Sequence, residues 1–540
     1  MSANLRDAVY LYDTTLRDGT QGEGISLSVE DKLALLRFLD TFGVAYVEGG
    51  WPGSNPKDLE FFRRAGDVPL QRARLAAFGS TRRPGSACDD DPNLAALLEA
   101  GTPVVTLFGK SWDLHVTQAL RTSLEENLAM IRESVAHMAG QGREVVYDAE
   151  HFFDGYLRNP EYAWATLRAA REGGARWIVL CDTNGGTLPH EIERITAEVA
   201  RRLDVPLGIH CHNDSGVAVA NSLAAVRAGA RQVQGTINGL GERTGNADLV
   251  TILPNLALKL GYRLVPEPQM ERLQELSRTV SERVNRPPDP FHPFVGESAF
   301  AHKGGIHVSA VRRQPETYEH VPPERVGNRR RVLVSELSGA SNVLYKAREY
   351  GLELDPETPV VRDLLRHVKE LEHQGYHFEA GEASFELLLR RALGLVPPFF
   401  TLEGFRLTVA KGGPDGTPGP DAEATIRLRV GSERIHTAAS GNGPVNALDH
   451  ALRKALLPVY PTLASFRLVD YKVRVLDGQA GTAARVRVLI ETAADSTRWG
   501  TVGVSTNIIE ASWLALVDSV EYGLMKMQVE RPGNWAVSTG

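Results

Sequence analysis

A cluster of acid, arginine, hydroxyl and glycine residues near the N-terminus has the side chains that metal and carboxylate chemistry needs. It reads DTTLRDGTQGEG, residues 13–24, and directly follows an apolar run. A carboxylate such as Asp18 can bind a hard divalent cation, and the guanidinium of Arg17 can hold a carboxylate through two parallel hydrogen bonds. Glycine, aspartate and threonine are also common turn residues, so this stretch alone leaves an ordinary capped turn open.

A histidine pair, His210 and His212, ends the apolar run at residues 207–212. Side chains two apart on a strand point to the same face, so both imidazoles can approach one metal ion. With Asp18 and a further oxygen donor, for which Asn246 in NGLGERTGNADL is a candidate, they suit Mg, Mn, Co or Zn. The alternative for the two histidines is a position in the core or on the surface. The alternative for the run that contains Asn246 is a glycine-rich turn.

The first half of the chain alternates short apolar runs with longer amphipathic stretches. The runs are residues 8–12, 44–48, 74–78, 103–108, 144–150, 177–182, 207–212 and 233–238. Strands that alternate with helices predict a parallel sheet with crossover helices. Eight such units in about 250 residues predict a (β/α)8 TIM barrel. A doubly wound sheet is the second choice, because no dinucleotide glycine fingerprint follows the first run.

Polar residues stand at the same end of successive apolar runs. They include the segment from Asp13 to Asp18 and the later residues Glu48, Glu150, Asp182, His210 and Asn238. In a TIM barrel the reactive groups gather at the C-terminal ends of the strands. We therefore expect these side chains to meet at one mouth of the barrel.

The composition is that of a globular protein with about two to four domains. The 540 residues are 42% hydrophobic and 24% charged, and the net charge is −7. That balance argues against bulk binding of nucleic acid or of a membrane. The three cysteines are scattered, and we find neither a secretion signal nor an apolar stretch long enough for a membrane helix. These features predict a cytoplasmic protein.

The second half of the chain changes pattern twice. After the predicted barrel at residues 1–280, proline-rich pieces and helical segments predict linker subdomains over 281–395. Over 396–540, runs with period two are followed by a helical stretch, and this order occurs twice. We therefore expect a duplicated α+β domain at the C-terminus.

The motifs DTTLRDGTQGEG, HCHND and NGLGERTGNADL occur together and in this order in the acyl-CoA-dependent 2-oxo acid aldolases, and the chain resembles that family. Its members include 2-isopropylmalate, homocitrate and citramalate synthases and the hydroxymethylglutaryl-CoA lyases. The resemblance implies a TIM barrel in which Asp18, His210 and His212 bind a divalent metal ion. It also implies that Asn246 either belongs to the metal site or lies next to the metal ligands.

The resemblance also implies roles around the substrate. Arg17 would hold the oxo acid and stabilise an enolate, Glu150 would be the active-site glutamate, and Thr183 would lie near the substrate carboxylate. We also expect Asp148 and Phe108 to contact the substrate. Lyases are less similar, because they generally lack the C-terminal repeat.

The stretch AFAHKGGIH, residues 299–307, resembles the segment after the barrel in this family. Its histidine reaches over a barrel mouth, commonly that of the partner subunit, and His307 matches it better than His302. A solvated loop histidine is the alternative. The general base of the reaction could be Glu150 or His307.

Four further stretches, GGWPGSNPKD, FGSTRR, FGKSWDLHV and YDAEHFFDGY, resemble the citramalate synthase group of the family. The bulky Phe108, Trp112 and Phe152 could narrow the pocket towards the methyl group of pyruvate, or could simply pack at the barrel mouth. The implied reaction joins acetyl-CoA to pyruvate. The alternatives are 2-oxoisovalerate as the oxo acid and a catalytically inactive amino-acid sensor.

The C-terminal repeat resembles the allosteric domain of the family, in which an end-product amino acid binds at a dimer interface. For a citramalate synthase the implied effector is isoleucine, and for a 2-isopropylmalate synthase it is leucine. We expect a homodimer. Dimerisation without regulation is the alternative, because coupling between sites has to be demonstrated.

Overall fold

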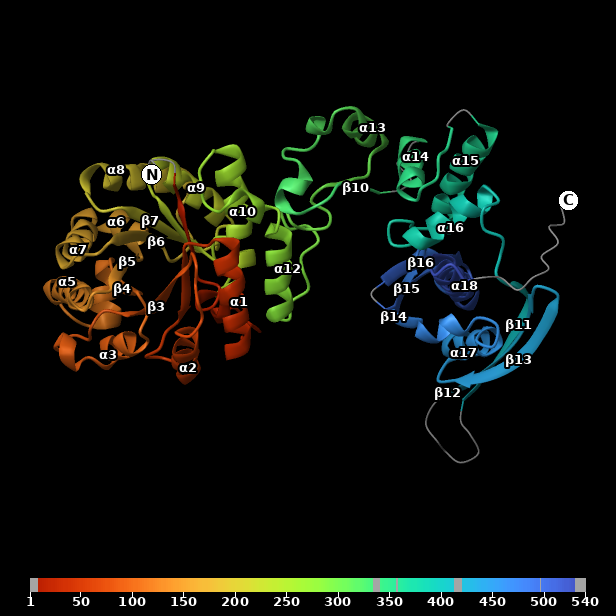
Figure 1. Cartoon of the computed structure of the whole chain (residues 1–540), viewed down its shortest axis with the longest axis horizontal. Helices are drawn as coiled ribbons and strands as arrows, with labels where there is room; N and C mark the ends of the chain where they lie inside the picture. The colour runs from red at the N-terminus through yellow and green to blue at the C-terminus, as the bar shows by residue number, and fades with distance from the viewer. Residues whose placement is uncertain (1–7, 334–339, 356–357, 412–419, 496, 530–540) are drawn as a thin grey trace. The chain divides into compact units, whose positions relative to one another are not determined.

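The computed structural model describes residues 8–333, 340–355, 358–411, 420–495 and 497–529, which divide into two units (Figure 1). The first unit contains the chain up to Phe300 together with Glu319–Arg330, and the second contains Ala301–Tyr318 and the chain from Arg331 onward. Among the described helices none is long and apolar enough to cross a membrane. The domain boundaries predicted near residues 280 and 395 stay predictions.

The first unit is built on a closed barrel of eight parallel strands, which confirms the predicted TIM barrel. The strands are β1 (Tyr10–Asp13), β2 (Tyr46–Gly50), β3 (Arg74–Ser80), β4 (Val104–Lys110), β5 (Glu144–Glu150), β6 (Trp177–Asp182), β7 (Leu207–Cys211) and β8 (Gln232–Gly235). β1 closes the ring, because Asp13 pairs with Val47 of β2 on one side and with Gly235 of β8 on the other.

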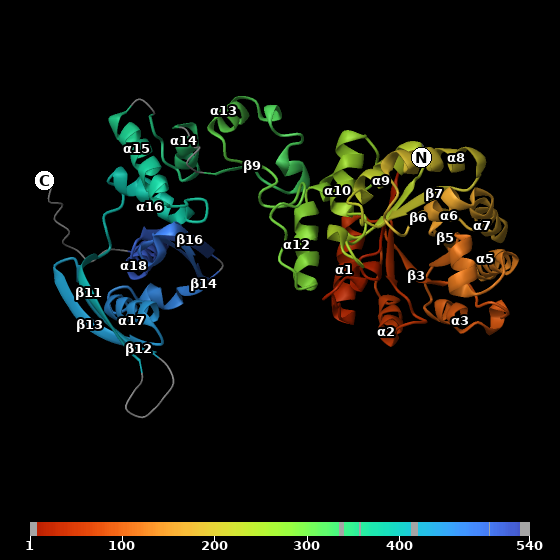
Figure 2. The same cartoon turned by 180° about the vertical axis from the view of Figure 1, so that it is seen from behind.

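Helices surround the barrel on its outside (Figure 1, Figure 2). They are α1 (Val29–Phe42), α2 (Pro56–Ala65), α3 (Pro92–Glu99), α5 (Leu124–Gly140), α7 (Pro160–Gly173), α8 (Pro189–Arg202), α9 (Ala218–Ala228) and α10 (Leu249–Pro254). α1 begins after Ser28, whose hydroxyl accepts a hydrogen bond from the Asp31 N–H while the Asp31 carboxylate accepts one from the Ser28 N–H. This capping box satisfies two backbone donors at the helix start.

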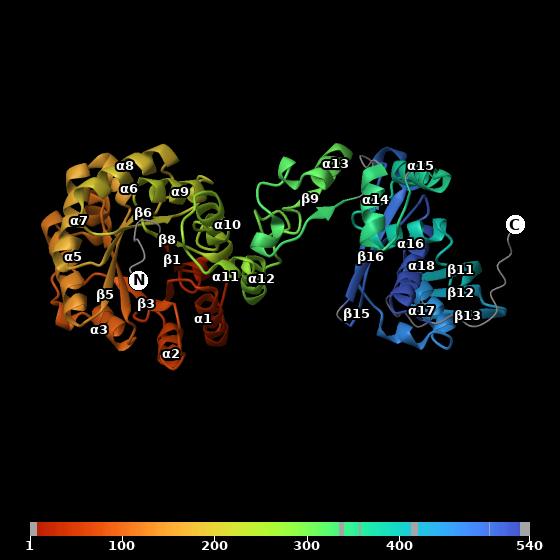
Figure 3. The same cartoon turned by 45° about the horizontal axis from the view of Figure 1, so that its top comes forward.

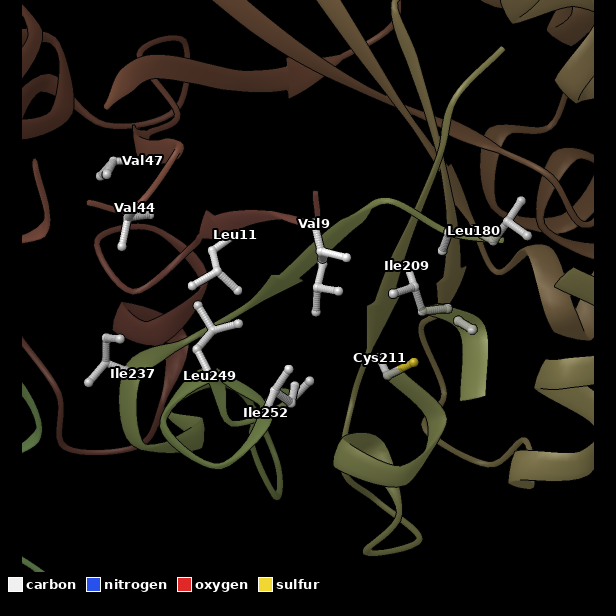
Figure 4. Packing of buried hydrophobic residues seen from close by; sticks show 14 of the residues in the cluster. Val9, Leu11, Val44, Val47, Leu180, Ile209, Cys211, Ile237, Leu249 and Ile252 are labelled. Atoms are coloured by element: carbon white, nitrogen blue, oxygen red, sulfur yellow. The ribbon is translucent and has the colours of Figure 1, made fainter. Parts of the chain in front are cut away.

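Alternate residues of each strand face two different layers. Leu11 and Ile209 point outward into the apolar layer between strands and helices, where Figure 4 also shows Leu249 and Cys211. Because neighbouring strand residues point to opposite faces, His210 points into the barrel. The same alternation turns the side chain of His212, which follows Cys211, to the inner side.

The barrel interior has its own packed cluster below the mouth, formed by Tyr12, Val104, Trp177 and Val179 among others. Short elements cover the mouth itself: a 3-10 turn at Asp18–Gln21, α4 (Asp113–His115), a π-helical turn at Val116–Leu120, α6 (Phe152–Arg158) and a 3-10 turn at Ile237–Gly239. They follow β1, β4, β5 and β8. The unit ends with a π-helical turn at Asn255–Lys259, α11 (Glu267–Met270) and α12 (Leu273–Arg283), and α12 packs against α1.

The second unit begins with a helical region (Figure 3). Its elements are β9 (Ala301–His302), α13 (Gly305–Arg313), β10 (Arg331–Val332), α14 (Ala340–Glu349), α15 (Pro359–Gln374) and α16 (Glu382–Ala392). β9 and β10 pair in parallel. Val343, Leu364 and Phe385 contribute to a small core that joins α14, α15 and α16.

Two repeats of three antiparallel strands and a helix follow, and they confirm the predicted duplication. The first contains β11 (Thr401–Lys411), β12 (Pro420–Val430), β13 (Glu433–Gly441) and α17 (Pro444–Leu456), and the second contains β14 (Arg467–Val475), β15 (Val486–Ala494), β16 (Thr497–Ser505) and α18 (Ile508–Lys526). α17 packs on β12 and β13, and α18 packs on β15 and β16. Ile426, Leu448 and Leu516 belong to one core shared by both repeats.

Candidate active site

A cavity of about 200 Å3 opens at the C-terminal ends of the barrel strands. Its lining contains Arg17, Asp18, Gln21, Trp51, Phe78, Phe108, Asp148, Glu150, Cys181, Thr183, His210, His212, Glu242 and Arg243. These residues lie on the eight strands or on the segments that follow them, so the barrel brings together side chains from distant parts of the sequence. Asn246 adjoins this set through a backbone bridge to His212.

Three lining residues, Asp18, His210 and His212, offer ligand atoms that all lie within 4.8 Å of one another. His210 Nε2 is 3.5 Å from Asp18 Oδ2. That carboxylate oxygen is buried and has no hydrogen-bond partner among the described residues. A buried carboxylate oxygen without a partner is costly unless a cation neutralises it.

Gln234 fixes which nitrogen of His210 faces Asp18. His210 Nδ1 lies 2.9 Å from Gln234 Oε1, and Gln234 Nε2 donates to Asp148 Oδ1 at 2.9 Å. An amide oxygen can only accept, so Nδ1 carries the proton and Nε2 presents a lone pair. Two acceptors facing each other, Nε2 and Asp18 Oδ2, fit a divalent cation between them.

The protonation states suit metal binding. Burial lowers the pKa of His210, and it lowers the pKa of His212 to about 3, with help from the neighbouring His210. Burial alone would raise the pKa of Asp18, but Arg17, His210 and His212 hold it below its usual value. The set is therefore two neutral imidazoles and one carboxylate, which is the form that binds metal.

Asn246 adds an oxygen beside this set. Its Oδ1 is buried without a hydrogen-bond partner among the described residues, while its Nδ2 donates to the Leu240 carbonyl at 3.1 Å. Gly241, at φ +154°, leaves room for this amide, because a Cβ there would lie 2.1 Å from Asn246 Nδ2. A free amide oxygen next to His212 fits the predicted role of a further metal-site residue.

Arg243 contacts His212 from the mouth of the cavity. Its Nη2 lies 3.0 Å from His212 Nδ1, and it forms a two-pronged ion pair with Asp214 at 2.7 and 2.9 Å. A guanidinium only donates, so Nδ1 accepts this hydrogen bond. A metal ion held through Nδ1 would replace this contact, and one held through Nε2 would leave the proton on Nδ1 and break the contact. Sequence reasoning did not single out Arg243.

Arg17 is held by three neighbours. Its Nε donates to Glu48 Oε1 at 2.6 Å, its Nη1 lies 3.4 Å from Asp18 Oδ1, and its guanidinium carbon lies 3.8 Å from the centre of the Phe78 ring. Glu48 is fully buried, and its Oε2 accepts from the Tyr12 hydroxyl at 2.7 Å. Glu48 is noted above only as a polar strand end, and its contact with Arg17 is visible only in the folded barrel.

Two carboxyl groups of β5, Glu150 and Asp148, also line the cavity. Glu150 forms an ion pair with Lys110. Burial, with the charge of Glu48, raises the pKa of Asp148 to about 8, so this group is mainly protonated at neutral pH. One group can accept a proton and the other can donate a hydrogen bond.

An aromatic wall narrows the cavity. The rings of Phe78 and Phe108 stack with centroids 5.2 Å apart, and Trp51 meets Phe108 edge-on at 5.5 Å. Trp112 and Phe152 do not line this cavity: Trp112 stacks on a histidine, and Phe152 is buried in the outer apolar layer. Phe108 therefore lines the cavity, as expected from the sequence. Trp51 and Phe78 line it in place of Trp112 and Phe152.

His307 lies on α13 and His302 on β9, both in the second unit. The His307 ring packs on Tyr318 with centroids 4.2 Å apart, and its side chain is exposed. Its catalytic role therefore stays a prediction.

Comparison with known proteins agrees with the observed fold. The HMGL-like family matches residues 8–280, the homocitrate synthase post-HMGL domain-like family matches 294–376, and the LeuA allosteric (dimerisation) domain matches 379–524. The chain is 56% identical to the (R)-citramalate synthase of Aquifex aeolicus, over 97% of this chain and 99% of that one. It is 55% identical to that of Synechocystis sp., over 99% and 100%.

A probable 2-isopropylmalate synthase of Methanopyrus kandleri is more distant, at 35% identity over 95% of this chain and 98% of that protein. The higher identities extend over nearly the whole length of both partners, and the family matches cover the barrel and both later regions. The chain therefore belongs to the HMGL-like family and, within it, to the group whose relatives are named (R)-citramalate synthase.

Proposed function

We propose that the protein condenses acetyl-CoA with pyruvate and hydrolyses the thioester, giving (R)-citramalate and CoA. The observation that carries this proposal is the placement of Arg17 between the Asp18, His210 and His212 set and an aromatic wall, in a cavity of about 200 Å3. The names of the relatives at 55–56% identity support the same reaction.

A divalent ion bound by Asp18, His210 and His212, with Asn246 beside it, would act as a Lewis acid on the oxo acid. Metal dependence of the HMGL-like family supports this assignment. Arg17 would bind the oxo acid and offset the negative charge of the enolate. The hydroxyl of Thr183 and the protonated carboxyl of Asp148 would donate hydrogen bonds to the carboxylate of pyruvate.

Glu150 would remove the proton from the acetyl methyl group, because it is a carboxylate that lines the cavity and its ion pair with Lys110 orients it. The enolate carbon then bonds to the ketone carbon of pyruvate, and the resulting alkoxide takes up a proton. Water adds to the thioester carbon and the C–S bond breaks. His307 is the alternative base.

Trp51, Phe78 and Phe108 would select pyruvate by size. A larger 2-oxo acid such as 2-oxoisovalerate carries two further methyl groups, which these rings leave little room for. The aromatic wall therefore favours citramalate over 2-isopropylmalate as the product.

We propose isoleucine as the effector of the C-terminal repeats. It would act by feedback, as the end product of an isoleucine biosynthesis that uses citramalate. The match of residues 379–524 to an allosteric dimerisation domain supports both an effector and a homodimer. Inhibition by isoleucine and not by leucine is the expected result.

The deciding experiment measures thiol release from acetyl-CoA with pyruvate or 2-oxoisovalerate, in the presence of Mg, Mn, Co or Zn and after chelation. We expect metal-dependent release with pyruvate preferred, and its loss in D18N but not in D89N, which changes an exposed carboxylate. A preference for 2-oxoisovalerate would overturn the citramalate proposal. No release with either oxo acid would instead favour an inactive sensor.

A further inference from the structure

Within the aromatic wall, the indole of Trp51 is held by a hydrogen bond. Trp51 follows β2, and its ring meets Phe78 and Phe108 edge-on, with centroids 5.8 and 5.5 Å apart. Its Nε1–H donates to Asn93 Oδ1 at 2.7 Å. Contacts between rings tolerate a range of angles, whereas a hydrogen bond needs a nearly linear geometry. The bond to Asn93 therefore defines how the indole is turned.

Asn93 uses both ends of its amide. While Oδ1 accepts from the indole, Nδ2 donates to the backbone carbonyl of Ser80 at 2.7 Å. An indole N–H only donates and a carbonyl only accepts, so a single orientation of the amide satisfies both partners. Ser80, at the end of β3, pairs with Phe108 of β4. One side chain therefore connects Trp51 to the strands that carry the other two rings of the wall.

The helix on which Asn93 stands does not need this amide. Asn93 lies in the first turn of α3, and Asp91 caps that turn by accepting from the backbone N–H groups of Asn93 and Leu94 at 3.0 and 3.1 Å. The helix start is therefore satisfied without the side chain of Asn93. The neighbouring strand leaves room for the amide, because a Cβ on Gly79 would lie 2.9 Å from Asn93 Oδ1. These contacts favour a role of the amide towards Trp51.

The backbone of Trp51 is held separately from its side chain. Its N–H donates to Asp58 Oδ2 at 3.0 Å, and the other oxygen of Asp58 forms an ion pair with the buried Lys32 at 2.5 Å. Lys32 Nζ also donates to the carbonyl of Gly49, in β2, at 3.0 Å. Side chains of α1 and α2 therefore fix the chain at this strand end. The remaining freedom is rotation of the Trp51 side chain, which the bond to Asn93 restricts.

We propose that Asn93 is a positioning residue for the choice of the oxo acid. It holds the Trp51 indole at the angle at which the wall accommodates the methyl group of pyruvate and excludes a branched side chain. Asn93 does not line the cavity, so it acts through Trp51. This inference rests on the proposed function, because it takes the three rings as the groups that select the substrate.

The test uses variants of the full-length, metal-loaded protein. N93L keeps the approximate size of the side chain and removes both hydrogen bonds, whereas N93D keeps an acceptor for the indole. W51F removes the indole N–H, and W51F/N93L completes a double-mutant cycle with the wild type. S123A is the control for lost stability, because the exposed Ser123 caps α5 by accepting from the Glu126 N–H. Melting temperatures establish that each variant is folded.

Steady-state kinetics with both oxo acids measure the effect. We expect N93L to raise kcat/KM for 2-oxoisovalerate, relative to that for pyruvate, by about threefold to thirtyfold. The KM for pyruvate should rise by a larger factor than kcat falls, because the metal donors and Glu150 are unchanged. N93D should shift the ratio less than N93L does. N93L should add nothing in the W51F background, and S123A should keep the wild-type ratio.

A second measurement does not depend on turnover. In protein with 5-fluorotryptophan at its seven tryptophan positions, the 19F resonance of Trp51 is assigned by its absence in W51F. We expect this resonance to shift in N93L, because the indole loses its hydrogen-bond acceptor and its fixed orientation. It should keep its wild-type position in S123A.

An unchanged ratio or an unshifted Trp51 resonance in folded N93L would overturn this role of Asn93 and leave the proposed function standing. An effect of N93L that is equally large in the W51F background would also overturn it, because Asn93 would then act by another route. If the wild type itself preferred 2-oxoisovalerate, the proposed function would fail. The role in selecting pyruvate would fail with it, even if the Trp51 resonance shifted in N93L.

Discussion

Glu48 holds the guanidinium of Arg17 in place. One carboxylate oxygen accepts from Arg17 and the other from Tyr12, and the whole side chain is buried. An arginine anchored through Nε keeps its terminal N–H groups for a substrate. We therefore expect position and charge at residue 48 to matter to catalysis, although Glu48 does not line the cavity.

The variant E48Q tests this role. It keeps the shape of the side chain but removes the charge that holds Arg17, so we expect kcat for CoA release to fall about a hundredfold. Y12F is the matched control: it removes one hydrogen bond to Glu48 and keeps the charge, so it should lose much less. Equal losses in both variants would show that the charge is not what positions Arg17.

Asp148 makes the stability of the barrel depend on pH. Its pKa is about 8 in the folded protein and about 4 in an unfolded chain, so between these values the folded state binds more protons. The contribution of Asp148 to stability is therefore lost as pH rises from about 4 to about 8. In D148N this loss is absent.

Urea unfolding of the metal-free protein at pH 5, 7 and 9 measures the effect. We expect D148N to gain stability relative to the wild type as pH rises over this range, with most of the gain below pH 8. A constant difference between the two proteins at all three pH values would contradict the raised pKa of Asp148.

At the scale of elements, three neighbouring strand ends build the aromatic wall that we propose to set substrate size. Trp51 follows β2, Phe78 lies on β3 and Phe108 lies on β4, so each strand contributes one ring. Removing one ring should enlarge the cavity without moving the metal donors, which come from β1 and β7.

We expect F108A to raise kcat/KM for 2-oxoisovalerate, relative to that for pyruvate, by about tenfold to a hundredfold. Steady-state kinetics with both oxo acids measure the ratio. F291A removes a phenylalanine that is 77% exposed, and it should leave the ratio unchanged. An unchanged ratio in F108A would mean that another group selects the oxo acid.

In the second unit, α18 approaches β16 so closely that only glycine fits at position 503. A Cβ there would lie 2.0 Å from the backbone oxygen of Ala511. G503A should therefore lower the free energy of unfolding of this unit by about 1–3 kcal/mol. Gly443 is the control, because it has an extended backbone and open space around its Cα. Calorimetry that finds equal stability in G503A and G443A would contradict this packing.

The sequence predicted elements wherever apolar periodicity was strong. All eight barrel strands lie at the predicted runs, because each strand buries apolar side chains in the layer between strands and helices. In the first C-terminal repeat, the period-two runs at residues 405–409 and 424–430 predict two strands, and the third strand, β13, is not predicted. Residues 433–441 contain one large aliphatic side chain, Ile435, and the strand is only partly buried. Its place depends on pairing with β12, which is a tertiary effect.

The same distinction between local sequence patterns and tertiary contacts holds in the site. Asp18, His210 and His212 could be proposed because their chemistry and motif spacing are local. Glu48 and Arg243 could not, because each acts through a residue that is far away in the chain. Such pairings have no periodicity, and only the closed barrel shows them.

At the scale of the whole molecule, the two units have separate cores and separate proposed ligands. The metal donors all lie in the first unit, and both C-terminal repeats lie in the second. A ligand that binds only the folded state stabilises the unit that holds its site.

Hydrogen exchange detects this separation. Mn2+ should protect amides in β1, β7 and the segment around Asn246, while isoleucine should protect amides in the two C-terminal repeats. Leucine at the same concentration is the control. If isoleucine protected no amide in β11–β13 or β14–β16, the proposed effector would be wrong.

The closure of the barrel also decides when the metal site can first exist. Asp18 follows β1, the two histidines belong to the end of β7, and Asn246 lies beyond β8, which pairs with β1. During synthesis the first donor therefore leaves the ribosome long before the last. The complete donor set forms only after the ring has closed, and tight metal binding by a growing chain would report that moment.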